Sequence, residues 1–236
     1  MIKLSKGILF LFSFFMTMNF CTPVFGAFFQ LEHGFSESQI TSLFAVFSFT
    51  VFIFEIPTGL LGDRIGEKKS LIIGAMLTGI STILFLIGNT AFIYIGEAIF
   101  GIGSTFYSGA FESLVYKYCK SSDNNLNYNK IVSETYALQW IALSFSFVGC
   151  FVFTTYGNIR WPFIATLISN IFLYMIAHFL PVTQKENKKN ISTFSIIKGF
   201  INDICSNKQL RIMCLLNVFC SMILVSGYQL LQAYFY

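Results

Sequence analysis

Charged side chains are scarce in this chain of 236 residues, of which Asp, Glu, Lys and Arg together supply only 11%. Soluble domains usually carry about 25% charged residues, so this chain has too little polar surface to coat a water-soluble globule. The deficit excludes an ordinary soluble protein and favours one whose solvent is lipid.

Patterns that bind metals, cofactors or nucleic acids are also missing from the sequence. The six cysteines contain no CxxC pair, and neither His33 nor His178 has a second ligand at coordinating spacing, so no metal or cofactor is expected. The sequence holds no nucleophile elbow, HExxH or P-loop, which argues against an enzyme. No basic patch with interleaved aromatic residues occurs on a polar segment, so nucleic acid is not an expected partner.

Apolar residues, in contrast, are abundant: 55% of the chain is hydrophobic and 30 residues are Phe. In lipid every main-chain polar group must be paired within the protein, which leaves helices or closed barrels. The apolar runs are long and lack the alternation of strands, so an all-α integral membrane protein is predicted. We expect seven spans, at about Ile8–Phe29, Ile40–Leu61, Ser70–Gly88, Ala91–Tyr116, Ser133–Tyr156, Trp161–Leu180 and Leu210–Tyr236.

The distribution of basic residues among the short loops predicts the orientation in the membrane. If the N-terminus is cytoplasmic, fourteen of the fifteen Lys and Arg residues fall on the cytoplasmic side and only Arg160 falls outside. Basic loops are retained in the cytoplasm, so we predict a multi-pass protein of the cell (plasma) membrane with a cytoplasmic N-terminus. The same alternation supports the number of spans, because removing one early span would scramble it.

The longest polar segment lies at about 182–208 and begins with the hydrophilic stretch Gln184–Asn190. Four apolar residues follow at spacings of three and four, which place them on one face of a helix: Phe194, Ile197, Ile201 and Ile204. Such a face predicts a helix that lies at the membrane surface, and a plain solvated linker is the alternative.

The junction between the second and third runs reads GLLGDRIGEKKSL over residues 59–71. This short, charged turn resembles the signature loop of the major facilitator superfamily, whose pattern is roughly G-x-L-a-D-R-x-G-R-K-x-x-L. Residues 97–116 are similar to the fourth helix of bacterial drug-efflux-like members. Three residues depart from the relatives' patterns: Glu67 replaces a basic residue, Glu97 an Arg and Lys117 an Asp. The fifth run also lacks the Gly-Pro pair of many proton-driven drug antiporters, so drug/proton exchange stays open.

The residue types in this loop have direct physical interpretations. Gly59 and Gly62 allow a helix end to approach a neighbour closely, and Gly66 permits a turn that a side chain resists. Asp63 is expected where the third span begins, where a carboxylate accepts helix N-terminal N–H groups. Three basic residues satisfy the positive-inside rule and can pair with carboxylates: Arg64, Lys68 and Lys69. The resemblance implies that the loop latches two bundles together as a gate.

Polar residues within the apolar runs point to a candidate site. In the fourth run a stripe roughly 80° wide holds Glu97, Gly101, Ser104, Ser108 and Glu112. Asn19 in the first run and Glu55 in the second lie on comparable stripes. A charge at membrane depth costs about 3 kcal/mol and usually faces a cavity or a partner. We predict a water-accessible cavity lined by the first, fourth and seventh spans, with interhelical packing as the alternative, and burial would favour the neutral form of Glu97.

The resemblance implies a six-helix bundle of two inverted three-helix repeats at 1–181, a cytoplasmic linker with the amphipathic helix at 182–208, and a seventh span at 209–236. The implied function is secondary active transport of a small molecule by alternating access, with proton-coupled efflux as one form and H⁺ or Na⁺ as the coupling ion. Family members usually have about twelve spans, so a missing C-terminal half is an implied partner besides substrate and bilayer. The alternative is a partial member without transport activity of its own.

Overall fold

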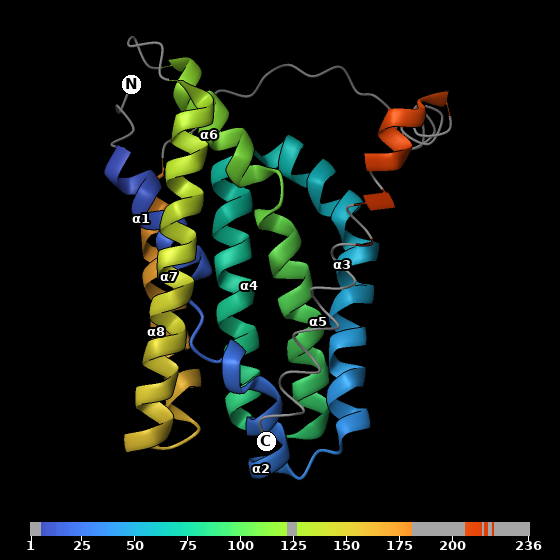
Figure 1. Cartoon of the computed structure of the whole chain (residues 1–236), viewed down its shortest axis with the longest axis vertical. Helices are drawn as coiled ribbons and strands as arrows, with labels where there is room; N and C mark the ends of the chain where they lie inside the picture. The colour runs from blue at the N-terminus through green and yellow to red at the C-terminus, as the bar shows by residue number, and fades with distance from the viewer. Residues whose placement is uncertain (1–5, 122–126, 181–205, 214, 217–218, 220–236) are drawn as a thin grey trace. The chain divides into compact units, whose positions relative to one another are not determined.

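A computed structural model of the chain describes residues 6–121, 127–180, 206–213, 215, 216 and 219. The chain divides into two compact units, Met1–Lys185 and Glu186–Tyr236, each considered by itself. The described residues of the first unit form a bundle of α-helices and one short 3-10 helix, with no strand (Figure 1). These elements are α1 Lys6–Thr17, η1 Thr22–Val24, α2 Phe25–His33, α3 Glu37–Ile65, α4 Glu67–Ile87, α5 Thr90–Tyr107, α6 Ala110–Ser121, α7 Tyr128–Tyr156 and α8 Trp161–Phe179.

Five stretches among the described residues are long and apolar enough to cross a membrane. They are Lys6–His33, which contains α1, η1 and α2, and the helices α3, α4, α7 and α8. This agrees with the expected first, second, third, fifth and sixth spans. The expected seventh span and the linker fall largely outside the described residues.

Polar caps explain why two spans begin earlier than their apolar runs. The side chain of Ser36 accepts from the N–H of Gln39, whose own side chain accepts from the N–H of Ser36, so α3 begins at Glu37. The side chain of Asn127 accepts from the N–H of Asn129, which starts α7 five residues before the expected Ser133.

The first span, expected at about Ile8–Phe29, contains a non-helical break. Helix α1 ends at Thr17, the segment Met18–Cys21 is non-helical, and η1 leads into α2. Pro23 explains the interruption, because it has no N–H to donate and its ring clashes with the carbonyl four residues back. Figure 1 shows α1 and α2 toward opposite ends of the bundle, so the break lies about midway along the first span.

The expected fourth span, Ala91–Tyr116, is also interrupted. Ser108 and Gly109 separate α5 from α6, and Gly109 adopts the left-handed φ of 69° that favours glycine. The predicted polar stripe is therefore continuous only from Glu97 to Ser104, and Glu112 belongs to a separate helix.

Helix α5 lies between α3 and α4 and packs closely on both. A Cβ at Gly101 would lie 3.1 Å from Cβ of Thr50 in α3, and one at Gly103 would lie 3.0 Å from Cγ2 of Thr78 in α4. Small residues allow such close approach of helices in a membrane. On the other side of the bundle, α1 packs against α7 and α8, and α8 packs against α4.

Candidate functional site

The break in the first span exposes three main-chain N–H groups that a continuous helix would have paired. The N–H of Asn19 donates to Oγ of Ser146 at 3.0 Å, and the N–H groups of Phe20 and Cys21 both donate to Oγ1 of Thr166 at 3.0 Å. Hydroxyl groups on α7 and α8 therefore replace the missing helical acceptors. Unpaired main-chain groups at membrane depth cost several kcal/mol each, so these contacts make the break tolerable.

The side chain of Asn19, a predicted cavity residue, completes the break. Its Oδ1 accepts from the N–H of Cys21 at 3.2 Å and from the thiol of Cys21 at 3.0 Å. On the carbonyl side, Oγ of Ser169 donates to the carbonyl of Met18 at 3.1 Å. The segment is thus held in a fixed non-helical shape by polar contacts.

Glu97 on α5 lies beside this break and is the one charged side chain among the described residues that is buried. Only 4% of it is exposed, and its Oε2 has no hydrogen-bond partner. Its charge bears on the thiol of Cys21, which places the two side chains near each other. The structure therefore brings together two predicted site residues, Asn19 and Glu97, around Cys21.

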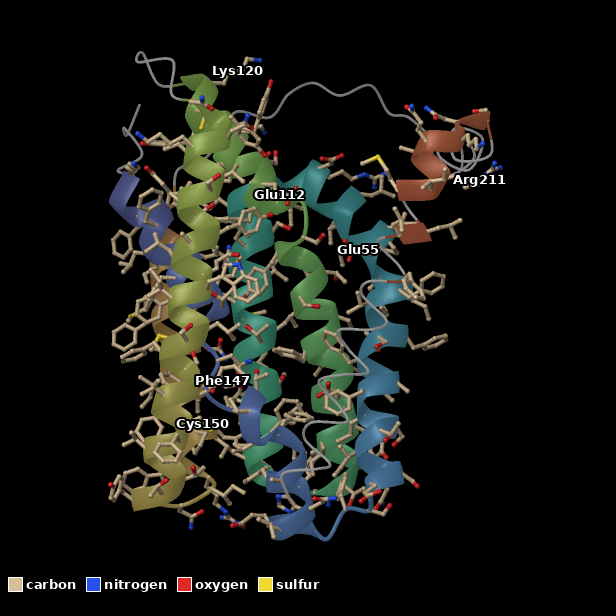
Figure 2. All side chains as sticks on the ribbon, viewed as in Figure 1. Glu55, Glu112, Lys120, Phe147, Cys150 and Arg211 are labelled. Atoms are coloured by element: carbon tan, nitrogen blue, oxygen red, sulfur yellow. The ribbon has the colours of Figure 1, made fainter. Side chains whose placement is uncertain are left out.

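The other two predicted cavity residues lie elsewhere. Glu55 is exposed on α3 of the first unit, and Glu112 is exposed on α6, where its Oε1 accepts from the hydroxyl of Tyr136 at 3.2 Å. Figure 2 places both toward one end of the bundle, away from Cys150. Asn19 and Glu97 therefore form the candidate site without Glu55 and Glu112.

The loop between α3 and α4 bears out part of its expected geometry. Gly66 has a φ of 91° and ends α3, with its N–H donating to the carbonyl of Gly62 at 2.8 Å. A Cβ at Gly62 would lie 3.2 Å from Oγ of Ser70, which is a close helix approach. A Cβ at Gly59 would meet no described atom within 4 Å, so the close approach expected there is absent from this part of the structure.

Asp63 does not lie where the third span begins. Helix α3 continues to Ile65, so Asp63 occupies its last turn, and α4 begins at Glu67. The helix extends because Gly62 and Gly66 pair within it, which leaves Glu67 as the acidic residue in the first turn of α4. The dipole of α4 therefore favours a carboxylate at Glu67, whereas Asp63 lies inside α3 rather than at the start of α4. Lys68, in the same turn, donates to the carbonyl of His178 at 2.6 Å.

Two of the residues that depart from the relatives' patterns are paired with each other. Glu67 accepts from the ammonium of Lys117 in an ion pair and from Oγ of Ser113 at 2.8 Å. Only 12% of the Glu67 side chain and 27% of the Lys117 side chain are exposed. The pair ties the first turn of α4 to α6. The two departures are thus opposite in charge and pair with each other.

Sequence reasoning missed the hydroxyls that hold the break. Ser146, Thr166 and Ser169 lie in apolar spans, where such residues also serve ordinary helix packing. In the sequence these three residues are visible only as hydroxyl side chains within apolar runs. Their role becomes visible once the structure places them beside the break in the first span. No group of His, Cys, Asp or Glu that could hold a metal ion occurs among the residues described.

Comparison with known families decides the relationship. The family model of the Major Facilitator Superfamily matches residues 7–236. The chain belongs to the Major Facilitator Superfamily. It is a multi-pass membrane protein, and its superfamily is one of transporters rather than enzymes, with small-molecule substrates.

A relative of this superfamily member occurs in Buchnera aphidicola subsp. Schizaphis graminum (strain Sg), where it is described as an uncharacterized transporter. The two are 25% identical over 170 residues, which cover 71% of this chain and 42% of the relative. The chain thus spans less than half the length of that relative. The match supports membrane transport in general.

Proposed function

We propose that the chain carries a small molecule across the membrane by alternating access, around the break in its first span, with Glu97 as the group that binds the coupling proton. The observation that carries the proposal is the buried carboxylate of Glu97, whose Oε2 has no partner, beside a non-helical segment at mid-span. Transporters commonly build their sites from interrupted helices near the membrane midplane. Intramembrane carboxylates commonly relay protons.

The helix contacts support an arrangement of two inverted three-helix repeats. The first span contacts the fifth and sixth (α7 and α8), the fourth contacts the second and third (α3 and α4), and the third contacts the sixth. If span one is exchanged with span four, two with five, and three with six, the same set of contacts results. A repeat interface that passes between the first and fourth spans would also pass beside Glu97 and Cys21.

The arrangement also favours one orientation. The start of α1, the α3–α4 loop and α6 lie toward the same end of the bundle in Figure 1, and these segments carry most of the basic residues of the first unit's described part. We assign this end of the bundle to the cytoplasmic side of the cell membrane by the positive-inside rule. Efflux is the proposed direction on the similarity of the fourth span to drug-efflux-like members alone.

The test is transport of candidate substrates into or out of vesicles that contain the full gene product, under imposed pH and Na⁺ gradients. Glu97→Gln keeps the size of the side chain but cannot release a proton, so it should abolish the response to a pH gradient. Glu37→Gln, at an exposed position in the first turn of α3, is the matched control and should retain that response. An unchanged response in Glu97→Gln, or a response to Na⁺ alone, would reject the proton-binding role.

A further inference from the structure

The two spans that are interrupted, the first and the fourth, each continue beyond the interruption as a short helix. The first span continues as α2, and the fourth continues beyond Ser108 and Gly109 as α6. Figure 1 shows α2 and α6 toward opposite ends of the bundle. The exchange of span one with span four, on which the proposed repeats rest, also exchanges these two short helices.

Each short helix is joined by an ion pair to the start of another helix. At the end that the proposed orientation places outside, Nε and Nη2 of Arg160 donate to Oε2 of Glu32 at 2.9 and 2.6 Å, which joins the last turn of α2 to the N-cap of α8. At the cytoplasmic end, the pair of Glu67 and Lys117 joins the first turn of α4 to α6. Exchange of the repeats places the start of α4 on the start of α8, and α6 on α2. The two ion pairs are therefore equivalent in place and opposite in polarity.

We infer that these two ion pairs are clasps, one on each side of the membrane, and that each controls access to the break in the first span from its own side. The pair of Arg160 and Glu32 is the external clasp, and the pair of Glu67 and Lys117 is the cytoplasmic clasp. This inference rests on the proposed alternating access. It also explains a basic residue at 160, outside the membrane, against the positive-inside distribution of the others.

The two clasps differ in strength. In the external clasp 52% of the Arg160 side chain and 22% of the Glu32 side chain are exposed, whereas the cytoplasmic clasp is largely buried and also includes Ser113. Water and salt weaken exposed ion pairs. Arg160 lies at the positive end of the α8 dipole and Glu32 at the negative end of the α2 dipole, whereas Glu67 lies at the favourable end of α4. The external clasp is therefore the weaker of the two.

The experiment uses the full gene product with Cys21 as its only cysteine and measures its labelling by a small membrane-impermeant thiol reagent. Glu32→Gln breaks the external clasp and should raise the labelling rate in intact cells by about two- to fivefold, with no rise in inverted vesicles. Lys117→Gln breaks the cytoplasmic clasp and should raise the rate in inverted vesicles by about tenfold or more, with no rise in intact cells. Lys6→Gln, which breaks the pair with Glu134 on α7, is the matched control and should change neither rate.

Exchange of the charges separates a clasp from general loosening of the fold. Glu32→Arg/Arg160→Glu restores the external pair and moves both charges to the favourable ends of their helix dipoles, so labelling in intact cells should fall below the unsubstituted rate by about twofold or more. Glu67→Lys/Lys117→Glu restores the cytoplasmic pair, so labelling in inverted vesicles should fall back toward the unsubstituted rate. A broken clasp that raises labelling equally from both sides would overturn the inference, as would an exchanged pair that is labelled as fast as the broken one.

The two proposals fail in different ways. If Cys21 is labelled from one side only, or from neither, in the unsubstituted protein and in both clasp variants, alternating access around the break is rejected and this inference with it. If Cys21 is labelled from both sides at rates that neither variant changes, this inference alone is rejected. Arg160→Gln breaks the external clasp as well and replaces Glu32→Gln if that variant does not fold. Glu67→Gln replaces Lys117→Gln in the same way.

Discussion

The ion pair between Glu67 and Lys117 predicts a specific pattern of charge reversal. Both side chains are largely buried, and Glu67 also accepts from Ser113. Lys117→Glu would place two carboxylates together and remove a hydrogen bond to a charged group, a loss of about 2–4 kcal/mol in the free energy of unfolding. The more exposed pair Lys6–Glu134, at 2.7 Å with 44% and 33% of the side chains exposed, is the matched control, and Lys6→Glu should cost about 0–1 kcal/mol.

The double variant Glu67→Lys/Lys117→Glu should recover most of the lost stability, because it restores the pair with its charges exchanged. Recovery should stop about 0.3–1 kcal/mol short, since a lysine in the first turn of α4 meets the unfavourable end of the helix dipole. The assay is reversible unfolding of the purified protein in mixed micelles. The reasoning is refuted if Lys117→Glu costs no more than Lys6→Glu, or if the double variant is less stable than Lys117→Glu.

Three further outcomes are expected. Gly101→Ala should lower the free energy of unfolding by about 1–3 kcal/mol, because the added Cβ would crowd α3. Gly59→Ala, where the added Cβ meets open space, should change it by less than about 0.5 kcal/mol. Equal effects of the two substitutions in the same unfolding assay would contradict the packing described. If the loop between α3 and α4 acts as a latch, Asp63→Asn should slow transport and favour the inward-facing state. The transport rate and the accessibility of a cysteine placed on the cytoplasmic side of the cavity measure these two effects, and normal values for both would reject the latch. Cys205, outside the described residues, should react with a membrane-impermeant thiol reagent in inverted vesicles but not in intact cells, and labelling in intact cells would reverse the proposed orientation.

The sequence was sufficient to predict features that depend on the average hydrophobicity of many neighbouring residues. Long apolar runs predicted the approximate positions of five spans, because hydrophobic length is a property that the bilayer imposes on each helix separately. The loop at 59–71 similarly revealed the family, and the family match confirms it. Capping residues, such as Ser36 and Asn127, shifted the helix starts by a few residues and were individually too weak as signals to predict this.

The candidate site could be predicted only in part, because its contacts join residues distant in sequence. Asn19 and Glu97 stood out because polar residues are rare in spans. Thr166 resembles any small polar residue until the N–H groups it accepts are located in space. The pairing of Glu67 with Lys117 was visible in the sequence only as two unrelated departures.

The central claim is that water reaches the break in the first span from each side of the membrane in turn. Cys21, buried at the break, is a native reporter of that access. In a variant that retains Cys21 as its only cysteine, a small membrane-impermeant thiol reagent should label it from outside in intact cells and from the cytoplasmic face in inverted vesicles. Labelling from one side only, or from neither side, would contradict alternating access around this break.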